Sequence, residues 1–169
     1  MRIQITTALM ITVLGMTCTA DYVKVECGLC VRSEPSEDGE VLEVLPFGTE
    51  VDGGDGDWIP CEGGYIASEW LCNDCPMELL GEWRITAYAY TGSPCADGSM
   101  PEVGVTIAQN NLPFGTKVYI DGVGVRTVTD RGPGYLGTEW CDLYLGETAE
   151  CVAWGDQVRK VYLVKEGKE

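Results

Sequence analysis

The sequence predicts a mostly β fold divided into two small domains, and three observations lead to this prediction. Glycine supplies 22 of the 169 residues, about twice the usual share of roughly 7%, which favours turn-rich β structure. Short apolar or alternating runs are separated by turn clusters such as the Asp-Gly-Gly-Asp-Gly of residues 52–56. A stretch punctuated by Pro76 and Gly81 divides the chain. We therefore expect a domain over 21–72, a linker over 73–81 and a second domain over 82–165.

The first twenty residues resemble a secretory signal peptide. Arg2 precedes an apolar run from Ile5 to Met16, and small residues at Cys18 and Ala20 favour cleavage after Ala20. The run is shorter than the about 20 apolar residues that cross a bilayer. The alternative is a buried first strand. A signal peptide predicts a secreted protein of the cell wall or periplasm.

The first domain is expected to be a small barrel, because its short strands follow one another closely. A domain of this size buries only a small core, so covalent links would add needed stability. The strands are expected at residues 22–25, 41–45, 50–52, 57–60 and 64–67.

The cysteines predict disulfides rather than a metal site. An even number in a small exported chain indicates four disulfides, with the pairing left open. Two Cys-x-x-Cys pairs have zinc-knuckle spacing, but their separation far exceeds the roughly 15–20 residues of usual zinc ribbons. We therefore expect no metal and no organic cofactor. After residue 20 the cysteines are Cys27, Cys30, Cys61, Cys72, Cys75, Cys95, Cys141 and Cys151.

The second domain is expected to contain six strands and one short helix. Ala149, Val152 and Ala153 share one face of the expected helix, and Gly155 provides a stop after it. The segment Leu-Pro-Phe-Gly-Thr occurs at 45–49 and again at 112–116, and we interpret both as the same proline–glycine turn feeding a strand. The strands are expected at 83–90, 105–108, 117–120, 125–129, 142–145 and 158–164, and the helix at 147–154.

Composition excludes several classes of function. The chain has no histidine, which rules out Ser-His-Asp and Cys-His catalysis and the sites of most zinc hydrolases. Acid–base chemistry must therefore come mainly from carboxylates. With 27 acidic and 11 basic residues the net charge is −16, which argues against nucleic-acid partners and against an electrostatic hold on anionic membranes.

Two carboxylates are the candidates for chemistry. Asp130 ends an expected strand and enters the turn Arg131-Gly-Pro-Gly, while Asp142 lies in the apolar surroundings of Trp140-Cys141 and Leu143-Tyr144-Leu145. Loss of hydration there would raise the pKa of Asp142 and let it act as a general acid. The alternative for Asp142 is an outward-facing residue, or an ion-pair partner of Arg126 or Arg131.

Four short segments of the first domain form an ordered set: Cys30-Val-Arg-Ser-Glu-Pro-Ser, Val41-Leu-Glu-Val-Leu-Pro-Phe-Gly-Thr-Glu-Val, Trp58-Ile-Pro and Gly64-Tyr-Ile-Ala-Ser-Glu-Trp-Leu. Together they resemble a bacterial SH3-like (SH3b) domain. The resemblance implies a module that binds cell-wall peptide or glycan. Trp58, Tyr65 and Trp70 can equally be core residues of a small barrel.

The second domain also contains an ordered set of short segments: Trp83-Arg-Ile-Thr-Ala-Tyr, Ala96-Asp-Gly-Ser-Met-Pro, Leu112-Pro-Phe-Gly-Thr-Lys-Val-Tyr-Ile, Thr129-Asp-Arg-Gly, Cys141-Asp-Leu-Tyr, Trp154-Gly and Val161-Tyr-Leu-Val. Together they resemble a three-aspartate (3D) domain. That family has a six-stranded double-psi β-barrel, like RlpA-like proteins, and is similar to the catalytic barrel of MltA-type lytic transglycosylases.

The resemblance implies that Asp142 is the catalytic acid and that Asp130 orients the substrate or stabilises the transition state. The first family aspartate is missing, because Ala108 or Gln109 occupies its place. Candidates for contacting the substrate are Tyr90, Thr91, Gln109, Asn110 and Arg131.

The function that follows is an exported enzyme that cleaves peptidoglycan glycan strands to a 1,6-anhydro product, with the SH3-like domain holding the wall. The alternative is a non-catalytic carbohydrate-binding or wall-loosening protein, like the expansin use of a double-psi barrel. A structural or phage-particle component is a third possibility.

Overall fold

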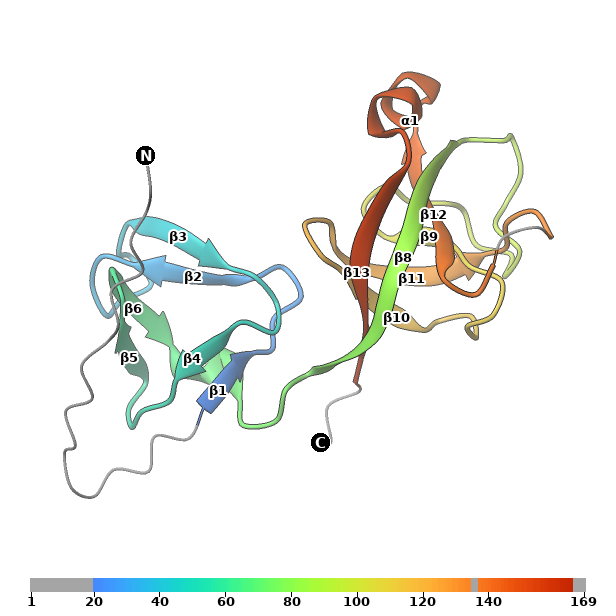
Figure 1. Ribbon diagram of the computed structural model, residues 1–169. Coiled ribbons are helices and arrows are strands. Elements are labelled where there is room, and N and C mark those ends of the chain that lie inside the picture. The colour runs from blue at the N-terminus through green and yellow to red at the C-terminus, as the bar shows by residue number, and fades with distance from the viewer. Residues whose placement is uncertain (1–19, 135–136, 166–169) are drawn as a thin grey trace, which may run out of the picture.

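The computed structural model describes residues 20–134 and 137–165, and its fold is mostly β, as predicted. The expected signal peptide lies almost wholly outside the described residues. Strands β1 to β7 form one group and strands β8 to β13 another, with helix α1 (Thr148–Trp154) at one end of the second group (Figure 1). We call residues 20–72 the N-terminal unit and residues 77–164 the barrel.

The N-terminal unit consists of two small antiparallel sheets. The three-stranded sheet has the order β4-β1-β7 and the four-stranded sheet the order β3-β2-β6-β5. A 3₁₀ turn, Ser68–Trp70, precedes β7. The strands are β1 (Ala20–Val23), β2 (Leu29–Arg32), β3 (Val41–Leu45), β4 (Glu50–Asp52), β5 (Trp58–Cys61), β6 (Gly64–Ala67) and β7 (Leu71–Cys72).

One apolar cluster holds these two sheets together. Alternation along β2 buries Leu29 and Val31, and Ile59 and Ile66 oppose each other in the β5–β6 register. Burying side chains of this size contributes about 1.5–3 kcal/mol each relative to exposure. Trp58 and Tyr65 are half-buried, whereas Trp70 is 43% exposed. Trp70 is therefore not a core residue.

The remaining strands close into a six-stranded barrel, in the order β10-β11-β9-β12-β8-β13. Both β11 with β9 and β12 with β8 run parallel, while the other barrel pairs are antiparallel. The strands are β8 (Met77–Ala89), β9 (Thr106–Ala108), β10 (Lys117–Ile120), β11 (Gly124–Asp130), β12 (Trp140–Gly146) and β13 (Gln157–Val164). The six strands and the single short helix agree with the predicted fold class, whereas the double-psi crossing stays a prediction.

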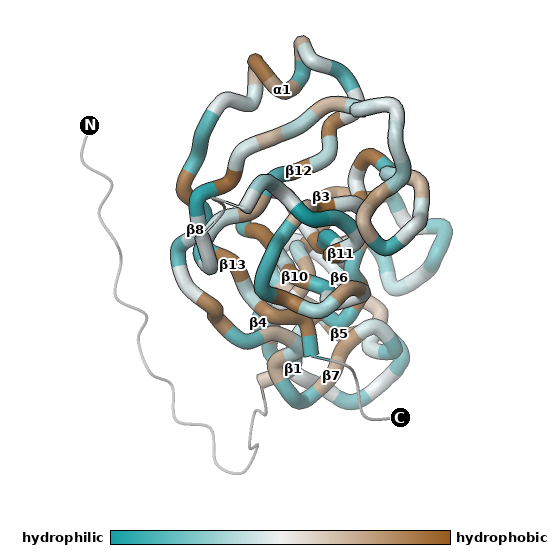
Figure 2. Tube along the Cα trace, turned by 90° about the vertical axis from the view of Figure 1, so that its right-hand side faces the viewer, coloured by the Kyte–Doolittle hydropathy of each residue, from teal (hydrophilic) through white to brown (hydrophobic). Residues whose placement is uncertain are grey.

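The barrel interior is apolar and continuous. Ile85 and Cys141 are neighbours in the β8–β12 register, Ile107 and Leu143 in the β9–β12 register, and all four belong to one buried cluster. Hydrophobic and hydrophilic residues alternate along much of the trace instead of gathering in one long apolar segment (Figure 2). Side chains on one strand alternate between the two faces, so the residues between these core positions face outward.

The two Leu-Pro-Phe-Gly-Thr segments form the same turn, as predicted. In each, the threonine N–H donates to the proline carbonyl, at 3.1 Å for Thr49 and 3.3 Å for Thr116. The glycine φ angles are 74° at Gly48 and 83° at Gly115, the left-handed region that favours glycine. Strands β4 and β10 follow at once.

Several boundaries differ from the prediction. Strand β8 begins at Met77, inside the expected linker, because residues 77–81 pair with the end of β13. Strand β2 (Leu29–Arg32) was not among the expected strands, since a cysteine and an arginine interrupt its apolar residues. No helix in the described part of the chain is long and apolar enough to span a membrane.

The four expected disulfides are absent, which corrects the prediction from the cysteine count. All eight cysteines of the described residues are free thiols. The strand cysteines do not face one another: Cys30 pairs with Val44, Cys72 with Tyr22 and Cys141 with Ile85 in the strand registers. Burial in the barrel core raises the pKa of Cys141 to about 12, so its thiol stays protonated at neutral pH.

Candidate functional site

The two candidate carboxylates lie two strands apart in the barrel wall. Asp130 on β11 is paired in register with Ala108 on β9, and Ala108 is paired with Asp142 on β12. Asp142 is in turn opposite Thr86 on β8. Neighbouring strands are about 4.8 Å apart, so the α-carbons of the two aspartates are separated by roughly 10 Å. Segments distant in sequence thus form one row of four residues, which we call the carboxylate row.

The outward face of β8 and β12 carries polar and aromatic side chains beside this row. Core residues alternate with Arg84, Thr86 and Tyr88 on β8 and with Trp140, Asp142 and Tyr144 on β12. The Arg84 guanidinium lies 4.0 Å from the centroid of the Trp140 ring and also pairs with Asp156. Aromatic rings beside carboxylates are common in carbohydrate-binding surfaces, because a ring can stack on the apolar face of a sugar.

A chain of hydrogen bonds holds Asp142 in place. The indole Nε1 of Trp140 donates to Thr86 Oγ1 at 2.7 Å, and Thr86 Oγ1 donates to Asp142 Oδ1. Partial burial raises the pKa of Asp142, while the Thr86 hydrogen bond and the positive charge of Arg84 act in the opposite direction. The effect of burial is the largest of the three, so the pKa of Asp142 is raised, as the apolar sequence around it predicted. Its hydrogen-bond partner is Thr86 rather than Arg126 or Arg131.

Asp130 is held by three donors. Its Oδ1 accepts from the backbone N–H groups of Ala96 and Arg131, at 2.9 and 2.8 Å, and its Oδ2 accepts from Tyr88 Oη at 2.9 Å. Three donors on one carboxylate fix its orientation. Asp130 is therefore held in one position at the end of β11.

Tyr88 holds one carboxylate, that of Asp130, a role that the sequence analysis did not predict. Its hydroxyl donates to Asp130, and its ring packs against that of Tyr144 with centroids 5.4 Å apart. Burial, followed by the hydrogen bond to Asp130 and the nearby charges of Asp130 and Asp142, raises the pKa of Tyr88 far above its ordinary value. Tyr88 is thus a neutral hydrogen-bond donor at any ordinary pH. Alternation along β8 predicts its face, but only the barrel closure brings it to Asp130.

The Gln109 side chain binds the backbone of the loop after β9 and of Thr138, and it does not point to the surface. Its side chain is completely buried. Its Oε1 accepts from the N–H groups of Asn111 and Leu112 at 2.6 and 2.7 Å, and its Nε2 donates to the Thr138 carbonyl at 3.1 Å. No amide atom is left for a sugar, so Gln109 does not serve as the predicted substrate contact in this structure.

Asn110 and Arg131 also stabilise the loops at the end of β11. Asn110 Nδ2 donates to the Pro133 carbonyl and its Oδ1 accepts from the Gly132 N–H, each at 3.0 Å. Arg131 donates from Nη1 to the Gln109 carbonyl at 2.5 Å, and its guanidinium lies 3.7 Å from the Phe114 ring centroid. Both side chains are partly exposed and border the carboxylate row.

Tyr90 and Thr91 lie just beyond the end of β8. Tyr90 is 49% exposed and its N–H donates to the Gly146 carbonyl at 3.0 Å. Thr91 is exposed at the start of the loop that supplies Ala96 to Asp130. Both side chains are therefore open to a ligand that enters along this loop.

Ala108 is one of the two residues expected at the place of a third aspartate. Ala108 stands between Asp130 and Asp142 in the strand registers, and it is buried. A methyl group there supplies no charge, so chemistry at this face would depend on Asp142 and Asp130 alone. No cluster of three or more metal-ligating side chains occurs within residues 20–134 and 137–165.

Comparison of the chain with known protein families, with curated proteins and with solved structures found no match. The SH3-like and three-aspartate resemblances thus stay predictions from the motifs.

Proposed function

We propose that the chain is an exported cell-wall protein whose barrel binds and cleaves the glycan strands of peptidoglycan. The observation that carries the proposal is the pairing of unlike carboxylates in one row. Burial raises the pKa of Asp142, while three donors keep Asp130 oriented. A carboxyl group with a raised pKa near a second, oriented carboxyl group is the kind of pair that glycosidic cleavage uses.

The separation of the carboxylates favours one mechanism over another. A retaining glycosidase with a carboxylate nucleophile needs its two carboxyl groups about 5–5.5 Å apart. Strand spacing puts the α-carbons of Asp130 and Asp142 roughly 10 Å apart, with Ala108 between them. This spacing does not favour attack by Asp130 on the sugar, and it is close to the about 6.5–9.5 Å between the carboxyl groups of an inverting pair that activates water. The internal nucleophile of our proposal is taken from the three-aspartate resemblance.

In the proposed reaction Asp142 donates its proton to the oxygen that links N-acetylmuramic acid to N-acetylglucosamine. The bond between that oxygen and muramic C1 breaks, and the leaving sugar gains a hydroxyl. The C6 hydroxyl of the muramic acid then attacks C1 and gives its proton to the Asp142 carboxylate. A 1,6-anhydro ring forms without water, the acid is regenerated, and Asp130 stabilises the positive charge that develops at C1.

A second candidate is a non-catalytic wall-binding protein. Two observations favour it: the uncharged Ala108 lies between the two carboxylates, and the side chains of Gln109 and Asn110 are engaged in loop hydrogen bonds. In that case the exposed Tyr90 and the half-buried Trp140 would contribute stacking surface. In both proposals the N-terminal unit serves as a wall-binding module, so that two weak contacts joined by a short linker raise the avidity.

The test is a digest of purified peptidoglycan, with the released muropeptides weighed by mass spectrometry. The native protein is compared with Asp142→Asn and with a control, Asp121→Asn, which removes an exposed carboxylate outside the row. We expect anhydro-muropeptides from the native and control proteins and none from Asp142→Asn.

Products with hydrated reducing ends would show that water is the nucleophile and would refute the proposed mechanism. If all three proteins sediment with the wall and release no products, the enzyme proposal is refuted and the non-catalytic wall-binding protein is supported.

A further inference from the structure

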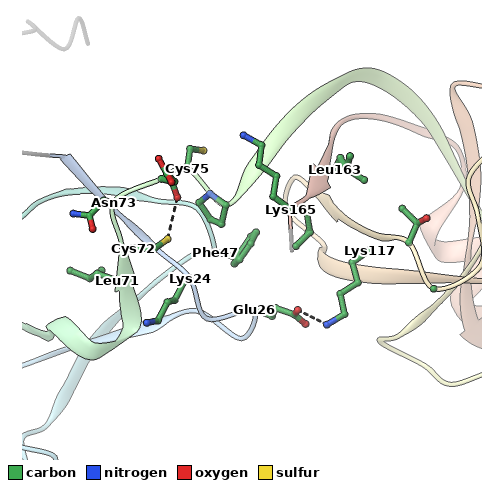
Figure 3. Close-up of a pocket in the computed structure, with 15 residues that line it drawn as sticks. Lys24, Glu26, Phe47, Leu71, Cys72, Asn73, Cys75, Lys117, Leu163 and Lys165 are labelled. Carbon is green, nitrogen blue, oxygen red and sulfur yellow. Dashed lines mark hydrogen bonds and ion pairs between the residues drawn. The ribbon is translucent and has the colours of Figure 1, made fainter. Parts of the chain in front are cut away.

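A pocket lies between the N-terminal unit and the barrel, away from the carboxylate row. It has a volume of about 1160 Å³. Residues of β7 and the linker form one wall, the turn at Phe47 another, and the ends of β10 and β13 the third (Figure 3). Both structural units therefore contribute to the pocket, and neither has the complete set of lining residues.

Two contacts fix the units across this pocket. The Phe47 ring, on the first of the two proline–glycine turns, packs 6.0 Å from the ring of Tyr119 on β10. Lys117 Nζ of β10 lies 2.6 Å from Glu26 Oε1 in the loop after β1. Both contacts join the N-terminal unit to the barrel, and Phe47, Glu26 and Lys117 also line the pocket.

The pocket has more lysines than carboxylates, in a strongly acidic chain. Its lining includes Lys24, Lys117 and Lys165 together with two acidic residues, Glu26 and Asp74, from a chain with 11 basic and 27 acidic residues. Lys117 is paired with Glu26, whereas Figure 3 joins neither Lys24 nor Lys165 to another lining residue. Among the described residues, no ion pair includes Lys24 or Lys165.

A second, smaller pocket does not share this excess of lysines. That pocket, of about 350 Å³ beside β4, is lined by four acidic residues and by no lysine or arginine. Its acidic residues are Glu43, Glu50, Asp52 and Glu62. A negatively charged ligand would thus be repelled there and attracted to the pocket between the units.

We propose that the pocket between the two units binds a short acidic peptide through its carboxylates. Lys24 and Lys165 would pair with carboxylates of the peptide, and the apolar walls formed by Phe47, Leu71 and Leu163 would contact its small side chains. A lysine is a point charge on a flexible stem and suits single carboxylates. The net charge of −16 opposes a polyanion such as nucleic acid.

The pocket is connected to the carboxylate row through one segment. Gly115 lines the pocket, and its N–H donates to the Val128 carbonyl at 2.8 Å, two residues before Asp130. Phe114, next to Gly115, contacts Arg131. The proposal itself does not depend on whether the barrel cleaves glycan.

The test is an NMR titration of the ¹⁵N-labelled full chain with two synthetic peptides. One is Ala-Glu-Ala-Ala with a free C-terminal carboxylate, and the other is Ala-Gln-Ala-Ala with an amidated C-terminus. We expect the acidic peptide to shift the amides of Lys24, residues 115–117 and residues 164–165, and the neutral peptide to bind more weakly. A higher salt concentration should weaken binding of the acidic peptide, because salt screens exposed charge pairs.

The matched variants are Lys24→Gln with Lys165→Gln, and Lys160→Gln, which removes an exposed lysine of β13 outside the pocket. An exposed ion pair changes affinity by about 1.5- to 5-fold, so loss of two such pairs should weaken binding by the double variant about 2- to 25-fold. The control should bind like the native chain.

The spectra also show whether each variant is folded. Equal binding of the two peptides, shifts at the carboxylate row alone, no shift at millimolar peptide, or an equal loss in Lys160→Gln would each overturn the proposal. A failed muropeptide digest would leave this titration unaffected, so the two proposals can fail separately.

Discussion

Replacement of Gln109 by leucine should destabilise the barrel without removing any group that faces a ligand. The Gln109 side chain is completely buried and makes three hydrogen bonds to the backbone of residues 111, 112 and 138. Leucine has a similar size, so the substitution removes the hydrogen bonds and leaves little cavity.

The size of the effect follows from these contacts. Each neutral hydrogen bond contributes about 0.5–1.5 kcal/mol, and burial of the leucine side chain returns part of the loss. We expect Gln109→Leu to lower the free energy of unfolding by about 2 kcal/mol. Asn111→Ala, at an exposed neighbouring position, is the control and should stay within about 0.5 kcal/mol of the native chain.

Urea unfolding followed by tryptophan fluorescence measures both variants, since Trp83, Trp140 and Trp154 report on the barrel. A Gln109→Leu variant with native stability would refute the buried-hydrogen-bond argument. Weakened glycan binding in such a variant would restore Gln109 as a ligand contact.

Three further predictions concern single contacts. Burial raises the folded-state pKa of Asp142, so the contribution of this carboxyl group to stability is present at low pH and is lost as pH rises through that pKa. The Asp142→Asn variant should therefore unfold at a higher temperature than the native chain at pH 7, and the difference should vanish near pH 3. A variant that is less stable than the native chain at pH 7 would contradict this. Tyr88→Phe removes one of three donors to a carboxylate and should cost about 1 kcal/mol in urea unfolding; no change would show that the hydrogen bond adds nothing. Gly48→Ala should lower the free energy of unfolding by about 1–2 kcal/mol, and by more than Gly63→Ala does. Both glycines have positive φ, but only an alanine at position 48 would collide with Met77. Equal shifts in melting temperature for the two variants would show that the collision is relieved.

The local pattern predicted what local forces determine. The two proline–glycine turns were predicted because proline and glycine fix the backbone angles by themselves. The helix at Thr148–Trp154 and the strand at Lys117–Ile120 followed from periodicity and the residues that end them. The raised pKa of Asp142 was also predictable, since its apolar neighbours are adjacent in the sequence.

The parts that were missed depend on contacts between distant segments. Tyr88 meets Asp130 only because four strands are ordered β11-β9-β12-β8, which no single segment encodes. Gln109 was expected to face a sugar because an amide at a motif position suggests recognition, yet the loop that it supports needs its hydrogen bonds. The cysteine count predicted disulfides, but a count carries no information on which thiols meet.

The parallel pairing of β11 with β9 and of β12 with β8 has a consequence for folding. Parallel neighbours are joined by long connections, and the carboxylate row draws its members from β8, β9, β11 and β12. Such non-local pairings form late and slowly, since loop-closure entropy is lost before the contacts form. During refolding, the recovery of any ligand binding at the row should therefore coincide with closure of the barrel and not with formation of individual strands.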